Sequence, residues 1–136
     1  MVGKKAHNNK PCVLVVGNLL LPDDNLPLRL LPRLKKSLPH VQFIEADPAE
    51  DIHRFGRNPI FLDAAEGVEK VTVVSDVDQI ESAPTLSLHG HDLAWEVKLM
   101  RKAGMLDSVR IIAVPRNARA DDVVEDVVSA VKSLTS

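Results

Sequence analysis

The sequence predicts one α/β domain, a mostly parallel, twisted sheet of about five strands with helices on both faces. Two observations support this fold class. Short apolar runs rich in β-branched residues alternate along the chain with segments whose apolar residues recur at helical spacing. The 136 residues are 45% hydrophobic and 26% charged, which suits a single domain with a sizeable core. We assign residues 11–136 to this domain and residues 1–10 to a flexible, polar N-terminal tail.

The first half of the chain predicts two strands with a helix between them. The run Cys12–Val16 is apolar throughout, as in a strand buried on both faces, and Gly17 follows it where a crossover loop would leave the sheet. Leucines at helical spacing predict a helix from about Leu31, with an irregular entrance because Pro32 would disturb an earlier start. A strand over 41–45 and a short proline-started helix from 47 come next.

The second half predicts three strands and two helices. The strands are 59–62, which ends on Asp63-Ala64-Ala65, then 70–74 and 109–114. An amphipathic helix spans 93–103 and can be closed by Gly104, and a final helix opens at Asp121-Asp122. Strands and helices thus alternate, as in a parallel sheet covered on both faces.

Charge and composition exclude several classes of function. Seventeen Lys and Arg residues against nineteen Asp and Glu give a net charge of -2, which provides no electrostatic drive toward nucleic acid. No apolar run approaches the roughly 18 residues of a membrane span, and the polar start lacks a signal-peptide core. The single cysteine, Cys12, permits no intrachain disulfide and fits a small core residue. We expect a cytoplasmic protein without membrane insertion.

Acidic and imidazole side chains stand where the predicted strands meet their loops. Asp23 and Asp24 follow the first strand, Asp63 follows the third, and His89 precedes the helix over 93–103. In open α/β sheets, binding sites collect at the carboxyl ends of strands. Two carboxylates and one imidazole can hold a divalent transition metal and leave a position open for substrate or water.

Each of these residues also has a purely structural interpretation. Asp23 or Asp24 can cap the following helix, and Asp63 can accept backbone N–H bonds in its turn. His89 and His91 can be exposed loop residues. The local pattern alone leaves both interpretations open.

Three segments in register add a family resemblance. Gly17-Asn18-Leu19-Leu20-Leu21-Pro22-Asp23-Asp24 resembles the opening signature of the nickel-iron hydrogenase maturation endopeptidases. Ile60-Phe61-Leu62-Asp63-Ala64 and Ser87-Leu88-His89 resemble their second acidic segment and their histidine segment. The resemblance covers roughly residues 11–135. The family fold, a five-stranded sheet between helices, agrees with the fold class predicted above.

The resemblance implies both an activity and a site. Such an enzyme removes the C-terminal extension from a nickel-iron hydrogenase large-subunit precursor after nickel insertion. Asp24, Asp63 and His89 would be the catalytic and metal-binding residues, with Asp23 and His91 as second choices that neighbour them. The nickel would be that of the precursor, and zinc or cadmium would bind in vitro.

The chain departs from the family pattern at two places that carry glycines in the family. It has Asn25-Leu26-Pro27 after the acidic pair and Glu45-Ala46-Asp47-Pro48 after the second strand. These departures keep open a non-catalytic relative that binds a hydrogenase subunit or assembly factor. A second alternative is a small-molecule-binding α/β module, although the chain has neither of the glycine-rich phosphate-binding motifs.

Overall fold

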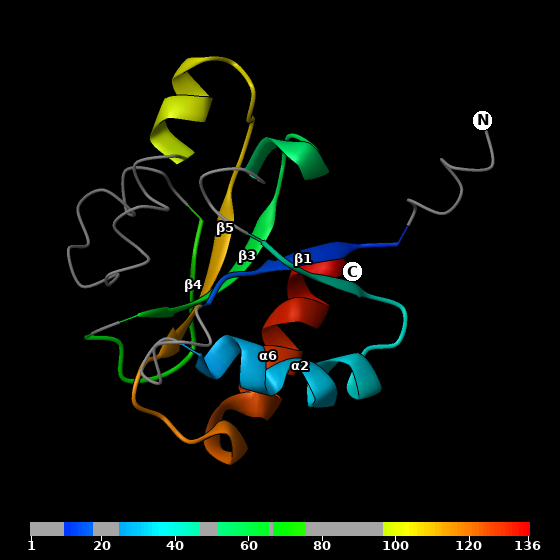
Figure 1. The fold of residues 1–136 in the computed structure, drawn as a ribbon, viewed down its shortest axis with the longest axis vertical. Coiled ribbons are helices and arrows are strands. Elements are labelled where there is room, and N and C mark those ends of the chain that lie inside the picture. The colour runs from blue at the N-terminus through cyan, green and yellow to red at the C-terminus, as the bar shows by residue number, and fades with distance from the viewer. Residues whose placement is uncertain (1–9, 18–24, 47–51, 66, 76–96) are drawn as a thin grey trace.

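The computed structural model describes residues 10–17, 25–46, 52–65, 67–75 and 97–136, with only the backbone at 52 and 53 (Figure 1). Its strands are β1 Cys12–Val15, β2 Gln42–Glu45, β3 Ile60–Ala65, β4 Thr72–Val74 and β5 Arg110–Pro115. Its helices are α2 Leu26–Ser37, the 3-10 helix η2 Ile52–Phe55 and α6 Ala120–Thr135, and residues 97–102 are also helical. The proposed tail is outside the described residues except for Lys10.

The five strands form one sheet in the order β2-β1-β3-β5-β4. Strand β1 pairs in parallel with β2 and with β3, β3 pairs in parallel with β5, and β4 is antiparallel to β5. The predicted mostly parallel sheet of five strands is therefore confirmed. The chain passes from β1 to β2 on one side and then returns to place β3 on the other side. The strand order thus reverses between β1 and β3, which is where open α/β sheets bind their ligands.

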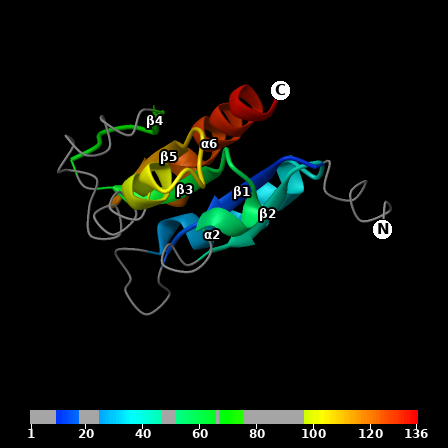
Figure 2. The same cartoon turned by 90° about the horizontal axis from the view of Figure 1, so that it is seen from above.

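Helices α2 and α6 lie next to each other on one face of the sheet (Figures 1 and 2). Buried residues recur every four positions, at Leu26, Leu30 and Leu34 in α2 and at Val123, Val127 and Val131 in α6, and α2 also buries Pro27 and Leu31. These side chains share one apolar cluster with alternate residues of the strands: Val13, Val15, Leu62, Ile112 and Val114. The spacing of apolar residues in the sequence thus translates directly into this layer.

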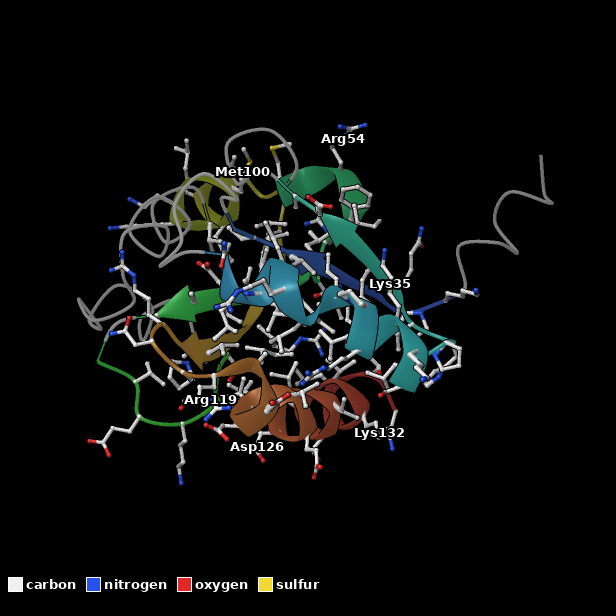
Figure 3. The ribbon with its side chains drawn as sticks, turned by 60° about the horizontal axis from the view of Figure 1, so that its bottom comes forward. Lys35, Arg54, Met100, Arg119, Asp126 and Lys132 are labelled. Carbon is white, nitrogen blue, oxygen red and sulfur yellow. The ribbon has the colours of Figure 1, made fainter. Side chains whose placement is uncertain are left out.

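The opposite face of the sheet carries a second apolar cluster. The other alternate strand residues point there, among them Leu14, Phe61 and Ile111, and pack against Val97 and Met100 of the helical residues 97–102. In Figure 3, Met100 and Arg54 of η2 lie on the side of the sheet away from the labelled α6 residues. Helices therefore cover both faces, as predicted. Among the described residues, none of the helices is long and apolar enough to cross a membrane.

Helix α2 begins earlier than the sequence pattern predicted. It starts at Leu26 rather than near Leu31 and continues through Pro32. Pro27 lies in the first turn, where a helix does not use the backbone N–H that proline lacks. Leu26 and Leu30 are fully buried, so packing of the first turns against the sheet compensates for the hydrogen bond that Pro32 removes. Tertiary contacts overrode the local signal.

Strand β3 is longer than predicted. We expected it to end at Leu62 with Asp63 in the following turn, but it runs through Ala65. Asp63 pairs with Ala113 of β5, and Ala64 and Ala65 pair with the next two residues of that strand. Pairing with β5 therefore holds Asp63 inside the strand and corrects its predicted loop position.

Candidate functional site

The candidate site lies at the carboxyl edge of the sheet, between β1 and β3. Asp63, in the second half of β3, is 3% exposed. It is the one charged or polar residue among the buried residues within the described ranges. An ionised carboxylate is costly to bury without hydrogen bonds or a cation, so a carboxyl group kept in this position suggests a functional role.

The pleat of β3 fixes the direction of the Asp63 side chain. Alternation along a strand places it on the same face as Phe61 and Ala65, which belong to the cluster covered by residues 97–106. The strand residues beside it, Val16 and Ala113, are apolar and at most 1% exposed. Its two cross-strand neighbours are therefore apolar side chains, which donate no hydrogen bond to the carboxyl group.

One oxygen of the Asp63 carboxyl group has a backbone donor. Pairing of β3 with β1 ends near Leu62, whose carbonyl oxygen accepts from the Val16 N–H at 2.9 Å. The next N–H of β3 on the β1 side belongs to Ala64, and it donates to Asp63 Oδ1 at 2.8 Å. The predicted structural role of accepting a backbone N–H is thus confirmed, but inside a strand. The bond anchors the carboxyl group where β1 and β3 stop pairing.

The other predicted site residues, Asp23, Asp24, His89 and His91, lie outside the described residues. The segment with the acidic pair connects the end of β1 to α2. The segment with the two histidines leads into the helical residues 97–102, whose fully buried Val97 packs in the cluster on the Asp63 face. Two of the three segments of the predicted site are thus connected by the chain to elements next to Asp63.

Only part of the predicted metal-binding set can be compared with the structure. Across the described ranges, no group of three His, Cys, Asp or Glu side chains is placed to hold a metal ion. Of the predicted ligands, the described ranges contain Asp63, and carboxylate oxygens such as those of Asp63 coordinate divalent cations. The assignment of Asp24, Asp63 and His89 as ligands stays a prediction.

The residues that replace the family's glycines adopt ordinary backbone conformations. Asn25 precedes α2 with φ of -102°, and its Oδ1 accepts from Arg29 Nε at 2.8 Å. Pro27 is buried in the first turn of the helix. Ala46 continues the sheet, because its N–H donates to the Val15 carbonyl oxygen at 2.9 Å. At these described positions the backbone does not adopt the left-handed conformation that glycine favours.

The sequence reading missed two features that bear on the site. Arg116 follows β5, is half-buried, and donates its backbone N–H to the Ala65 carbonyl oxygen at 3.0 Å, which places a cation at the same edge of the sheet as Asp63. At the opposite edge, Arg57 donates from Nε and Nη2 to both Asp107 carboxylate oxygens, at 3.0 and 2.9 Å, and from Nη2 to the Gly104 carbonyl oxygen at 2.7 Å.

The Arg57–Asp107 pair joins the segment before β3 to the segment that follows the helical residues 97–102. Its hydrogen bonds and charge attraction raise the pKa of Arg57 and lower the pKa of Asp107. No sequence signal identifies such a pair, because its members are 50 residues apart and have no motif around them. It helps to fix the helix that covers the face to which Asp63 points.

Comparison with solved structures identifies the fold. The chain is similar to the hydrogenase maturating endopeptidase HybD from Escherichia coli, with 15% identity, a TM-score of 0.64 and 91% of each chain covered. A Hydrogenase 3 maturation protease has 19% identity and a TM-score of 0.61, with 90% of this chain and 89% of that chain covered. The endopeptidase HycI from Escherichia coli has 19% identity and a TM-score of 0.55, with 93% and 92% covered. The sequence matches no family model and no curated protein significantly.

These likenesses confirm the fold that the resemblance implied. The chain has the architecture found in hydrogenase maturation endopeptidases over about nine-tenths of its length. At identities of 15–19%, the likeness concerns the fold and leaves the reaction to be argued from the residues.

Proposed function

We propose that this protein is an endopeptidase that removes the C-terminal extension of a nickel-iron hydrogenase large-subunit precursor after nickel has been inserted. The observation that carries the proposal is the buried carboxyl group of Asp63, 3% exposed, at the reversal of strand order between β1 and β3. The hydrogenase maturation endopeptidases among the structural neighbours support it.

The proposed roles belong to three side chains. Asp24, Asp63 and His89 meet the nickel that arrives with the precursor, so the metal is part of the substrate. A divalent ion held in this way polarises a carbonyl group and lowers the pKa of bound water. Asp63 supplies a carboxylate fixed by the Ala64 N–H at 2.8 Å, so it needs little rearrangement to bind. Asp23 and His91 are the neighbours proposed to orient these groups.

A cleavage assay tests the proposal directly. Purified protein is mixed with nickel-loaded or nickel-free large-subunit precursor, and the mass of the precursor is followed. We expect loss of the C-terminal extension only with nickel, and no processing by Asp63→Asn or His89→Ala. Asp126→Asn, an exposed carboxylate on α6, is the matched control and should process at the normal rate (Figure 3). Full activity of Asp63→Asn would refute the assignment of the site.

Metal binding can be measured separately from cleavage. Calorimetric titration with nickel, zinc and cadmium compares the wild type with His89→Ala. Binding that His89→Ala abolishes would support a metal-facing site formed by the protein alone. Binding that His89→Ala leaves unchanged would refute the role of His89 as a ligand.

A second candidate is a non-catalytic relative that binds a hydrogenase subunit or assembly factor. The start of α2 favours it, because Asn25 and the buried Pro27 stand where the family has glycine, and Asn25 accepts a hydrogen bond from Arg29. The same precursor assay separates the two candidates. A binder would co-purify with the precursor and leave its mass unchanged, whereas a peptidase would shorten it.

A further inference from the structure

Strand β2 lies at one edge of the sheet and has a partner, β1, on one side only among the described residues. The N–H of Gln42 donates to the Pro11 carbonyl oxygen and that of Ala46 to the Val15 carbonyl oxygen. The backbone N–H and C=O groups of the even-numbered β2 residues therefore point toward β1. In a parallel pair the odd-numbered ones point away from it, so Phe43 and Glu45 direct their N–H and C=O groups to the outer edge.

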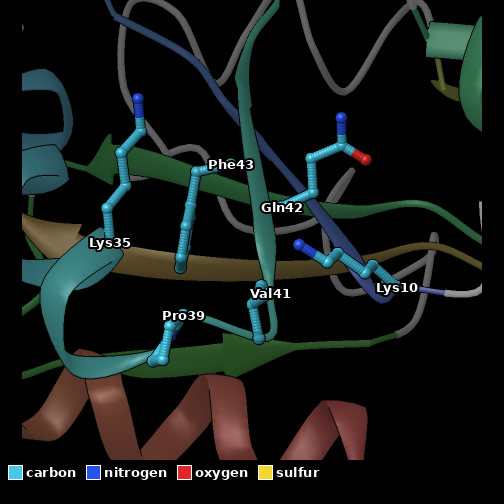
Figure 4. Close-up of a pocket in the computed structure, with 6 residues that line it drawn as sticks. All are labelled: Lys10, Lys35, Pro39, Val41, Gln42 and Phe43. Carbon is cyan, nitrogen blue, oxygen red and sulfur yellow. The ribbon is translucent and has the colours of Figure 1, made fainter. Parts of the chain in front are cut away.

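A hollow of about 570 Å³ lies beside this edge. It is lined by Lys10, Lys35, Pro39, Val41, Gln42 and Phe43. In Figure 4 the strand runs between two groups of side chains, with Lys35 and Phe43 on one side and Gln42 and Lys10 on the other. The open edge is therefore flanked by a lysine on each face of the sheet.

These charges favour an acidic partner. Side chains of an added strand alternate between the two faces, so two consecutive acidic residues would place one carboxylate toward Lys35 and the next toward Lys10. Glu45 is exposed on the same strand but does not line the hollow, whose two charged lining residues are both lysines. Lysines on an edge also oppose pairing of the strand with another copy of itself, which would bring the same lysines.

We propose that the outer edge of β2 binds an extended, acidic peptide segment of a protein partner, which adds to the sheet as a sixth strand next to Phe43 and Glu45. The main chain of the peptide would pair with the outward N–H and C=O groups, and its carboxylates would meet Lys10 and Lys35. The proposal does not rest on the peptidase activity, because the peptide need not be cleaved.

The probe is a capped octapeptide, Thr-Val-Thr-Glu-Glu-Val-Thr-Val, with the same peptide carrying Lys-Lys at the centre as its control. Binding is followed by amide resonances of the ¹⁵N-labelled protein at low ionic strength. We expect the Phe43 and Glu45 amides to shift and to exchange more slowly with the acidic peptide. The Lys-Lys peptide should leave them unchanged, and added salt should weaken the acidic complex.

Protein variants test the charges and the edge separately. Lys35→Glu and Lys10→Glu should each weaken binding by about 2- to 10-fold, since each turns one exposed attraction into a repulsion. Lys132→Glu, an exposed lysine on α6, is the matched control and should bind normally. Glu45→Pro removes an outward N–H without removing a bond to β1, so it should weaken binding while the far-ultraviolet circular dichroism is retained.

Several results would overturn the proposal. It fails if the acidic peptide at millimolar concentration neither shifts nor protects the Phe43 and Glu45 amides, or if the Lys-Lys peptide binds equally well. Protection of these amides that rises with protein concentration alone would instead assign the edge to a second copy of this chain. If Glu45→Pro does not fold, the lysine variants and the exchange data still decide the outcome.

Discussion

Replacing Asp63 in two ways should separate the role of its carboxyl group in the reaction from its role in the fold. Asp63→Asn retains an Oδ1 acceptor for the Ala64 N–H, so we expect a change in unfolding free energy below about 1 kcal/mol. Asp63→Ala removes that acceptor from a site that is 3% exposed, and the expected loss is about 1–3 kcal/mol. Both variants should be unable to process nickel-loaded precursor, because neither has the carboxylate.

Urea denaturation gives the free energies, and thermal unfolding gives an independent measure, with about 3 °C expected per kcal/mol for a domain of this size. Precursor processing is measured on the same preparations. A stable, inactive Asp63→Asn variant would support the proposed site. An Asn variant as destabilised as the Ala variant would refute the hydrogen-bond argument, and an active Asn variant would refute the catalytic role.

Three further predictions concern the scaffold. Pro32→Ala should stabilise the protein by about 1–3 kcal/mol in urea denaturation, because Pro32 is exposed inside α2 and an alanine restores an N–H donor; a loss of stability would contradict this account. Leu34→Ala should reduce the unfolding free energy by about 2–5 kcal/mol and so lower the urea midpoint, because Leu34 is fully buried in the apolar cluster between α2, α6 and the sheet. A reduction below about 1 kcal/mol would mean that neighbouring side chains move to fill the cavity. The lowered pKa of Asp107 beside Arg57 means that their pair stabilises the fold at neutral pH, and this contribution is lost as pH falls through the folded-state pKa of Asp107. Asp107→Asn should therefore reduce the loss of unfolding free energy between pH 6 and pH 2, measured by urea denaturation at each pH. An unchanged pH dependence would show that the pair contributes nothing to stability.

The sequence was sufficient for the fold because its signals were regular. Apolar residues at helical spacing predicted two of the helices, and β-branched runs predicted the strands of the parallel sheet. Boundaries failed where tertiary contacts decide them. Helix α2 begins at Leu26 because its first turn is buried, and β3 extends to Ala65 because β5 continues beside it. Neither cause is visible in the local sequence.

The site could be predicted from the sequence only in part. The position of Asp63 at the carboxyl end of an apolar strand followed from the apolar run before it and from the motif, but its place between Val16 and Ala113 depends on which strands become neighbours. The same holds for the Arg57–Asp107 pair, which joins residues far apart in the chain. Contacts of this kind arise from topology, and a single sequence carries no periodic trace of them.

The strand order also has a kinetic consequence. Strand β3 pairs with β5, which follows about 45 residues later, and α2 packs against α6, which lies at the other end of the domain sequence. Closing such large loops costs entropy before the contacts repay it, so refolding should take milliseconds to seconds rather than microseconds. Until α6 has docked, the leucines of α2 lack the valines that cover them in the folded protein, so apolar surface of this cluster stays exposed at that stage of folding.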